Sequence, residues 1–231
     1  MMASMFGPFA VFLASFIALA PTTSAAPRTF ELAATDHVRP VGIRVTMDTH
    51  LGQKCLRVVG VPDFRGEQVA ILEGSDLENG VIEADIAGQP LPGASSTARG
   101  FVGIAFRTAP DGSSLECFYI RPTNGRADDQ VRRNHSVQYV SIPGFSFDVF
   151  RKEAPEKYES YVDLVPGDWT HLRIEVEGAK ARLFVHQAAQ PTLLVNDLRG
   201  KIRSGAVALW IGDETEAWFR HVVVRGAAAG E

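Results

Sequence analysis

Between residues 118 and 139 the chain carries a dense set of hydrogen-bonding side chains, bounded by Tyr119 and Tyr139. Charges of both signs and amides are costly to order unless they pair with each other or with a polar ligand. Two interpretations follow: internal Arg–Asp pairing that holds a long connection down, or a polar-ligand site, since loops on rigid scaffolds often carry function. The polar residues are Arg121, Asn124, Arg126, Asp128, Asp129, Gln130, Arg132, Arg133, Asn134 and His135.

A second group of polar residues follows at Glu159, Tyr161 and Asp163, which alternate along an expected strand over 159–164. With Tyr119 and Arg121 they are expected to line one concave sheet. Carboxylates accept hydrogen bonds from sugar hydroxyls, and an aromatic ring packs against the C–H face of a sugar. The alternative is ordinary cross-strand charge pairing. The predicted ligand contacts are Tyr119, Arg121, Asp128, Arg132, His135, Tyr139, Glu159, Tyr161 and Asp163.

His135, Glu159 and Asp163 are the candidates for acid–base chemistry. As a general base, His135 needs a carboxylate to orient it, and Asp128 or Asp129 is available nearby. The alternative is a histidine that bonds a loop carbonyl. A serine triad is not supported, because the chain has no Gly-x-Ser-x-Gly elbow.

Metal and cofactor binding have little support in the sequence. Asp128, Asp129 and Asn134 form a calcium-like oxygen set, but their spacing matches no calcium-loop motif, so no cofactor is predicted. Cys55 and Cys117 each lie in a strand-like run and are too isolated for a metal site. Export would permit a disulfide between them. We favour free thiols, because a domain of this size does not need a covalent link.

Composition bounds the partners and the location. The chain has 231 residues, 45% of them hydrophobic, and a formal net charge of −4 with no Lys/Arg cluster, which argues against nucleic acid as a partner. Residues 1–25 are typical of a signal peptide: residues 6–20 are apolar but short for a membrane span, and Thr23-Ser24-Ala25 offers a cleavage site. We expect a mature N-terminus at Ala26, secretion or a periplasmic location, and no stable membrane span after cleavage. The alternative is an uncleaved anchor, since this segment lacks Lys and Arg.

The remaining chain shows strand periodicity without a sustained helical period. Ile82, Ala84 and Ile86 alternate with Glu83 and Asp85, and the same pattern recurs over 101–106, 170–177 and 181–186. Further strands are expected near 41–47, 54–60, 68–73, 115–121, 159–164, 192–196, 204–211 and 216–224. This pattern predicts an all-β fold of two antiparallel sheets, with one domain over 26–226 and a disordered tail over 227–231. The longest break, 122–158, is expected to fold over one mouth or face of the sandwich.

Several of these segments resemble a known superfamily. Residues 78–85 (ENGVIEAD), 101–107 (FVGIAFR) and 167–176 (GDWTHLRIEV) are similar to strands of the concanavalin A-like lectin/glucanase (laminin-G-like) superfamily. The resemblance is strongest for bacterial exported domains of the 3-keto-disaccharide hydrolase type. It implies a concanavalin A-like jelly roll over about residues 75–226. As a guide to function it is weaker, because this scaffold hosts many activities.

One difference bears on catalysis. Glucanases of the resembled type use a Glu-x-Asp-x-(x)-Glu strand, in which paired carboxylates cleave the glycosidic bond. Here Glu83-x-Asp85 is followed by Ala87 and Gly88, which argues against that route. The alternative for this pair is two solvated carboxylates on an outer strand. The sequence therefore predicts an exported carbohydrate-recognising sandwich, with a hydrolase of the 3-keto-disaccharide type or a structural or adhesive module as alternatives.

Overall fold

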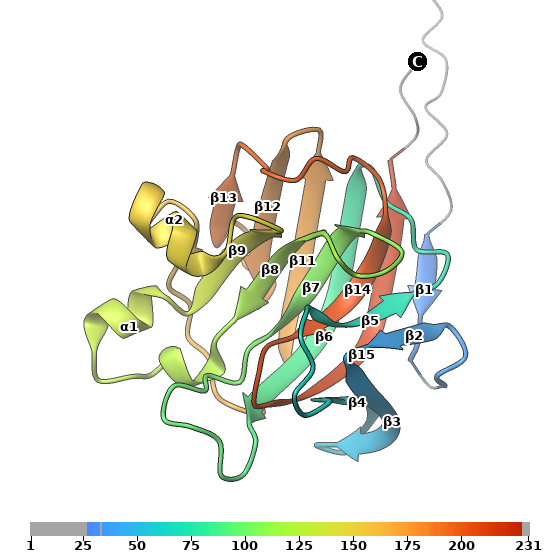
Figure 1. The fold of residues 1–231 in the computed structure, drawn as a ribbon, viewed down its shortest axis with the longest axis horizontal. Helices are drawn as coiled ribbons and strands as arrows, with labels where there is room; N and C mark the ends of the chain where they lie inside the picture. The colour runs from blue at the N-terminus through green and yellow to red at the C-terminus, as the bar shows by residue number, and fades with distance from the viewer. Residues whose placement is uncertain (1–26, 33, 228–231) are drawn as a thin grey trace, which may run out of the picture.

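The computed structural model describes residues 27–32 and 34–227, which form two antiparallel β-sheets packed face to face (Figure 1). This confirms the all-β, two-sheet prediction. The expected signal peptide over 1–25 lies outside the described residues, as does the tail beyond residue 227. Within the described ranges, no helix is long and apolar enough to span a membrane.

The first sheet has eight strands over the described residues, in the order β13-β12-β11-β6-β15-β4-β3, with β1 paired to β15. Its strands are β1 (Arg28–Phe30), β3 (Ile43–His50), β4 (Gln53–Gly60), β6 (Gly80–Pro90), β11 (Thr170–Glu177), β12 (Lys180–Val185), β13 (Leu193–Val195) and β15 (Thr215–Gly226).

The second sheet has seven strands over the same residues, in the order β10-β9-β8-β7-β14-β5-β2. Its strands are β2 (Val38–Val41), β5 (Gln68–Leu72), β7 (Val102–Thr108), β8 (Leu115–Ile120), β9 (Val137–Ile142), β10 (Glu159–Ser160) and β14 (Ala206–Ile211). The short helices η1 (Pro122–Asn124), α1 (Gln130–Asn134) and α2 (Phe147–Glu153) lie beside β8 and β9 (Figure 1).

The main core lies between the sheets and is built from the alternating apolar positions of both. Because successive side chains of a strand point to opposite faces, Ile82, Ile174 and Ile104 face inward with their alternating neighbours. Ile174 is fully buried, whereas Arg173 on the opposite face lies over the Phe184 ring. The predicted inward register of residues 170–177 is therefore correct.

Two parts of the predicted strand pattern were wrong. Residues 122–158 are not one long loop: they contain η1, α1, α2 and the six residues of β9, which occupies a position inside the second sheet. The strand expected over 159–164 ends at Ser160, because β10 pairs with only Gln138 and Val137 of β9. After that point Ser136 holds the chain, since its Oγ accepts a hydrogen bond from Val162 N at 2.9 Å.

Both sheets also carry apolar side chains on their outer faces. Cys117 belongs to a cluster with Val69, Ala105 and Ala208 on the outer face of the seven-stranded sheet. Cys55 packs with Ala87 and Trp218 on the outer face of the eight-stranded sheet. The two cysteines therefore lie on opposite sides of the sandwich. Both are free and buried, as favoured from the sequence.

Candidate functional site

Arg121 is the centre of a polar cluster at the outer face of the seven-stranded sheet. It directly follows β8 and continues the alternation that points Tyr119 outward, yet it is 3% exposed. Its Nη2 donates to the Tyr119 hydroxyl at 2.8 Å and to Gln138 Oε1 at 3.1 Å. Its Nη1 donates to the His135 carbonyl at 2.9 Å. A buried guanidinium must have its hydrogen bonds satisfied, and these neighbours supply the acceptors.

Glu159, at the start of β10, supplies the negative charge of the cluster. Its carboxylate accepts hydrogen bonds from Arg151 Nε at 3.0 Å and from Arg151 Nη2 at 2.5 Å. Arg121 Nη1 lies 3.4 Å from Oε1, and His135 Nε2 lies 3.5 Å from Oε2. The Glu159 side chain is 4% exposed. Because all three basic side chains contact this one buried carboxylate, Glu159 positions them.

Next to this cluster, two aromatic rings meet above a glycine. Gly103 on β7 is paired with Tyr119 on β8 and with Trp210 on β14. A Cβ at position 103 would lie 2.3 Å from the Phe118 carbonyl oxygen, so this position has no room for a side chain. The Tyr119 and Trp210 rings approach to 4.8 Å between centroids across this position. Phe101 packs edge-on against Tyr119 at 6.2 Å and extends the aromatic surface.

The protonation states of the cluster follow from burial. Burial raises the pKa of Tyr119 to about 12, so its hydroxyl stays protonated and accepts the hydrogen bond from Arg121. Partial burial is the first cause that lowers the pKa of His135; Glu159 opposes this shift, and Arg151 and Arg121 add to it. The imidazole is therefore neutral near pH 7 and can both donate and accept hydrogen bonds.

Four of the predicted contact residues, Tyr119, Arg121, His135 and Glu159, come together in this cluster. The carboxylate beside His135 is Glu159, and not Asp128 or Asp129 as expected. Asp129 instead accepts a hydrogen bond from the Arg132 backbone and caps α1, and Asp128 is exposed.

The other predicted residues lie elsewhere. Tyr139 points into the main core on the opposite side of β9 from Gln138, because strand neighbours alternate. Arg132 fastens α1 to η1 through Asn124 Oδ1 at 2.9 Å.

The two predicted residues after β10 are both exposed. Tyr161 accepts a hydrogen bond from Arg133, and Asp163 forms a bidentate pair with Arg126 at 2.8 Å.

Asp163 and Glu159 do not form a carboxylate pair across one face, since the strand expected to align them ends at Ser160. Within residues 27–32 and 34–227, no group of three or more His, Cys, Asp or Glu side chains is arranged to hold a metal ion. Of the calcium-like set noted in the sequence, Asp129 caps α1.

The sequence argument missed four residues of the site: Gln138, Phe147, Arg151 and Trp210. Gln138 was hidden inside the segment taken as a loop, although Val137, Tyr139 and Ser141 alternate with it. Phe147 and Arg151 are four positions apart on α2, so both lie on one face of that helix and reach the cluster. Trp210 was assigned to a strand but not to the site. Its Nε1 donates to Glu67 Oε2 at 2.7 Å.

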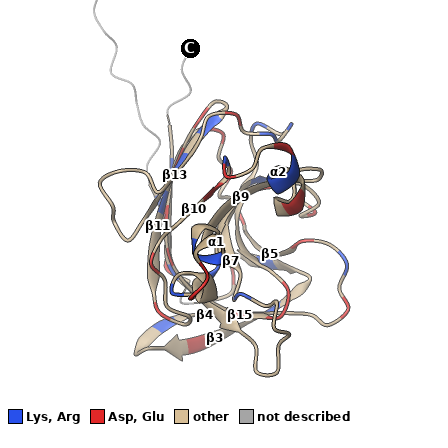
Figure 2. Cartoon of the chain, turned by 90° about the vertical axis from the view of Figure 1, so that its left-hand side faces the viewer, with Lys and Arg blue, Asp and Glu red and all other residues tan. Residues whose placement is uncertain are grey.

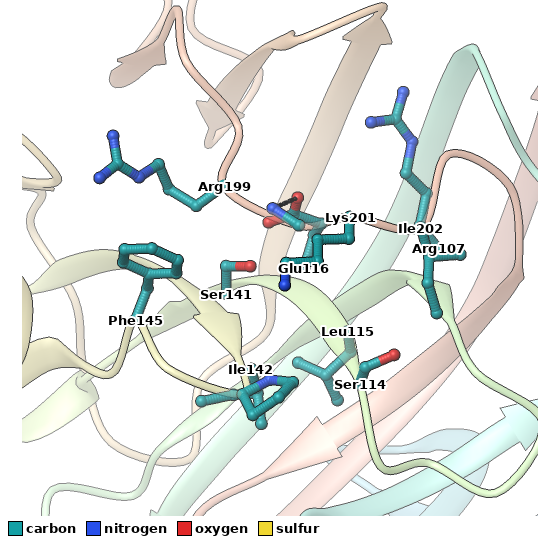
Figure 3. Close-up of a pocket in the computed structure, with 12 residues that line it drawn as sticks. Arg107, Ser114, Leu115, Glu116, Ser141, Ile142, Phe145, Arg199, Lys201 and Ile202 are labelled. Atoms are coloured by element: carbon teal, nitrogen blue, oxygen red, sulfur yellow. Dashed lines mark hydrogen bonds between the residues drawn. The ribbon is translucent and has the colours of Figure 1, made fainter.

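A separate pocket of about 290 Å³ lies at the other end of β8 (Figure 3). Arg199 and Phe145 line one side and Ile202 the other, with Glu116 between them. The Glu116 carboxylate accepts hydrogen bonds from the Tyr139 hydroxyl and from Gly200 N, and burial raises its pKa. These bonds fasten the segment around Gly200 to the sandwich, so Glu116 and Tyr139 hold this segment in place.

The carboxylates of Glu83 and Asp85 lie on the outer face of the eight-stranded sheet, away from this site. Asp85 accepts hydrogen bonds from His171 at 2.8 Å and pairs with Arg220 at 3.0 Å. Glu83 accepts one from Arg225 at 2.8 Å. Each carboxylate is paired with a basic side chain of a neighbouring strand, so the two carboxylates stabilise the pairing of strands in this sheet.

The order and packing of the two sheets define a concanavalin A-like β-sandwich, as the sequence resemblance implied. No protein-family model matches the chain, and no curated protein matches it either.

Among solved structures, the chain is similar to a Bacillus subtilis protein of unknown function with a galectin-like fold. The TM-score is 0.55 at 11% identity, over 89% of this chain and 99% of that one. It is also similar to the carbohydrate-binding module CBM66 from Bacillus subtilis, with a TM-score of 0.48, 14% identity and coverage of 79% and 94%. A third similar structure is domain 4 of AbnA, an extracellular arabinanase from Geobacillus stearothermophilus, solved with arabinotriose. Its TM-score is 0.48 at 12% identity, over 90% of this chain and 95% of that one. At these identities the similarity concerns the fold alone.

Proposed function

We propose that this chain is an exported carbohydrate-binding protein whose glycan lies on the outer face of the seven-stranded sheet. The observation that carries the proposal is the aromatic surface of the partly exposed Trp210 and Phe101 rings, which pack on the buried Tyr119 ring directly beside the Arg121–Glu159 cluster. A sugar needs both surfaces, because its C–H face packs on aromatic rings while its hydroxyls bond to polar groups.

The segment over 122–158 flanks this face at the edge of the sheet. Phe150 of α2 packs into the main core, while Phe147 and Arg151 of the same helix turn toward Arg121 and Glu159. In the proposal the glycan lies beside this segment, along β8, β7 and β14. Glu159 and Arg121 position the exposed groups, and Arg151, His135, Phe147 and Trp210 contact the sugar.

The test is a glycan-binding screen by calorimetry, with and without a chelator, on the wild-type chain and on two tryptophan variants. We expect Trp210→Ala to weaken binding of any bound glycan by about tenfold or more, through loss of the ring surface. Trp169→Ala, on the other sheet, is the matched control and is expected to keep wild-type affinity.

Melting curves of both variants separate loss of binding from loss of folding. Equal affinity of Trp210→Ala and wild-type protein would contradict the proposed location. A wild-type protein that melts cooperatively yet binds no glycan would favour a structural or adhesive module. Release of sugar products from a bound glycan would favour the hydrolase alternative.

A further inference from the structure

Two arginines belong to the candidate site, Arg121 and Arg151, and two more, Arg99 and Arg132, lie on segments next to it. Arg99 lies in the loop between β6 and β7, Arg121 follows β8, Arg132 is on α1 and Arg151 is on α2. The backbone of Thr123 links two of them, since its N–H donates to the Arg99 carbonyl and its carbonyl accepts from Arg132 Nη2. Lys and Arg on α1 and α2 are visible in Figure 2.

Most of the hydrogen bonds that Arg99, Arg121 and Arg132 donate go to uncharged acceptors, so they do not neutralise the positive charge. Arg99 Nη1 donates to the carbonyls of Ser96 and Ala98, at 2.6 and 2.9 Å. Arg132 donates to the side chain of Asn124 and to Thr123, and Arg121 reaches only one carboxylate, that of Glu159. Over these four arginines, Glu159 and Glu67, whose carboxylate accepts a hydrogen bond from Trp210, the formal charge is four minus two, or +2, in a chain whose net charge is −4.

The arginines are close enough to affect one another. The pKa of Arg99 is lowered, first by burial and then by the nearby cations Arg132 and Arg121. Burial likewise lowers the pKa of Arg121, and Arg151 adds to this. Arginine stays charged in proteins, so this repulsion persists in the free protein. An anionic ligand would relieve it, and would meet guanidinium groups already oriented by their hydrogen bonds.

We propose that the sugar bound at this site is an acidic one, a glycan that carries uronic-acid carboxylates. This inference rests on the proposed carbohydrate-binding function and specifies the ligand class. A guanidinium binds a carboxylate through two parallel hydrogen bonds. Arg151 already binds Glu159 through Nε and Nη2, and its side chain is 35% exposed. Its remaining nitrogen, Nη1, and the exposed Phe147 ring beside it would offer a donor and an apolar surface to such a ligand.

The experiment compares matched pairs of oligosaccharides by calorimetry. Oligomers of galacturonate, glucuronate and mannuronate are each titrated beside their carboxyl-reduced, neutral counterparts. We expect at least one acidic oligomer to bind about tenfold or more tightly than its reduced counterpart. We also expect this preference to shrink in about 0.5 M salt, where screening weakens exposed charge interactions.

Variants separate charge from shape. Arg99→Gln is expected to lower the affinity for the acidic oligomer several-fold more than the affinity for its reduced counterpart, whereas Arg99→Lys, which keeps the charge but not the two parallel hydrogen bonds, is expected to retain part of the preference. Arg44→Gln, at an exposed position on β3, is the matched control and is expected to behave as wild type.

The outcomes distinguish the inference from the function on which it rests. Equal binding of an acidic oligomer and its reduced form, or binding of neutral glycans alone, overturns the acidic-ligand inference and leaves the carbohydrate-binding function intact. No binding of any glycan, acidic or neutral, overturns both.

Discussion

Glu159 receives hydrogen bonds from Arg151 and lies against Arg121 and His135, all from different segments of the chain. A carboxylate in this position has its negative charge compensated by more than one cation. Removing it leaves the guanidinium groups of Arg121 and Arg151 without the carboxylate that they share. The residue therefore determines both the geometry of the site and part of the stability of the fold.

The first stability prediction compares two carboxylates. We expect Glu159→Gln to lower the free energy of unfolding by about 3–5 kcal/mol, the typical cost of breaking a buried ion pair by removal of one partner. Asp163→Asn, which breaks the exposed pair with Arg126, should leave the free energy of unfolding close to that of the wild-type protein, because solvent screens this pair. Urea denaturation of both variants provides the measurement. Equal losses would show that Glu159 is not the buried centre described here.

At the residue scale, the sequence identified the types of side chain better than their orientation. Arg121 and Tyr119 could be assigned to one face because they are two positions apart at the end of an apolar strand. Tyr139 was placed on the wrong face, because the strand that contains it was not recognised. Arg151 lies eight positions before Glu159, on a helix of seven residues whose docking depends on tertiary contacts.

At the scale of elements, α2 joins the core to the site. Phe150 is 2% exposed and packs on Tyr158, with ring centroids 4.0 Å apart, and on Tyr139 at 5.6 Å. Phe147, three positions earlier, is 43% exposed and lies near the Arg121 guanidinium at 5.6 Å from its ring centroid. Phe150 thus anchors the helix in the core, while Phe147, one turn earlier on the helix, supplies its ring to the site.

The different environments of Phe150 and Phe147 predict that truncating the two rings destabilises the protein to different extents. Phe150→Ala should lower the free energy of unfolding by about 3–5 kcal/mol, because it leaves a cavity in the core. Phe147→Ala should change it by less than about 1 kcal/mol, since the ring is largely solvated. Denaturation curves measure both. If Phe147→Ala is the more destabilising change, the helix docks mainly through Phe147 and not through Phe150.

The strands that the sequence predicted well are those with strict alternation and a turn at each end, such as β6, β11 and β12. β9 was missed because its outward-facing residues include Gln138, and because polar helices flank it on both sides. β10 was overextended, since residues 161–164 keep the alternating pattern without a neighbouring strand. A pattern of side chains does not reveal where backbone partners end.

For the whole molecule, charge is distributed unevenly. The outer face of the eight-stranded sheet carries ladders in which Asp85 and Glu83 are paired across strands with His171, Arg220 and Arg225. The region around Arg121 has an excess of arginine over carboxylate. The net charge of the sequence therefore does not describe the surface that would meet a ligand.

Two histidines on different sheets should give the molecule opposing pH dependences. The hydrogen bond to Asp85 is the first cause that raises the pKa of His171, so its contribution to stability is full below the unfolded pKa and is lost as pH rises through the folded pKa. Burial lowers the pKa of His135, so its contribution to stability is full above the unfolded pKa and is lost as pH falls from there through the folded pKa.

Single substitutions separate the two effects. In urea unfolding between about pH 5 and about pH 8, His171→Gln should make stability rise more steeply with pH than in wild-type protein. His135→Gln should do the reverse. Parallel curves for wild type and His171→Gln would rule out a role for the Asp85 pair in this pH range.

Gly103 has a consequence for engineering. Directed evolution of the proposed sugar site would naturally randomise the positions beneath it, and residue 103 is among them. A side chain there would meet the Phe118 carbonyl oxygen at 2.3 Å, so library members altered at this codon would be lost to misfolding before their selectivity was assayed. Diversity is better placed at positions 101 and 210, whose rings flank the glycine and are partly exposed.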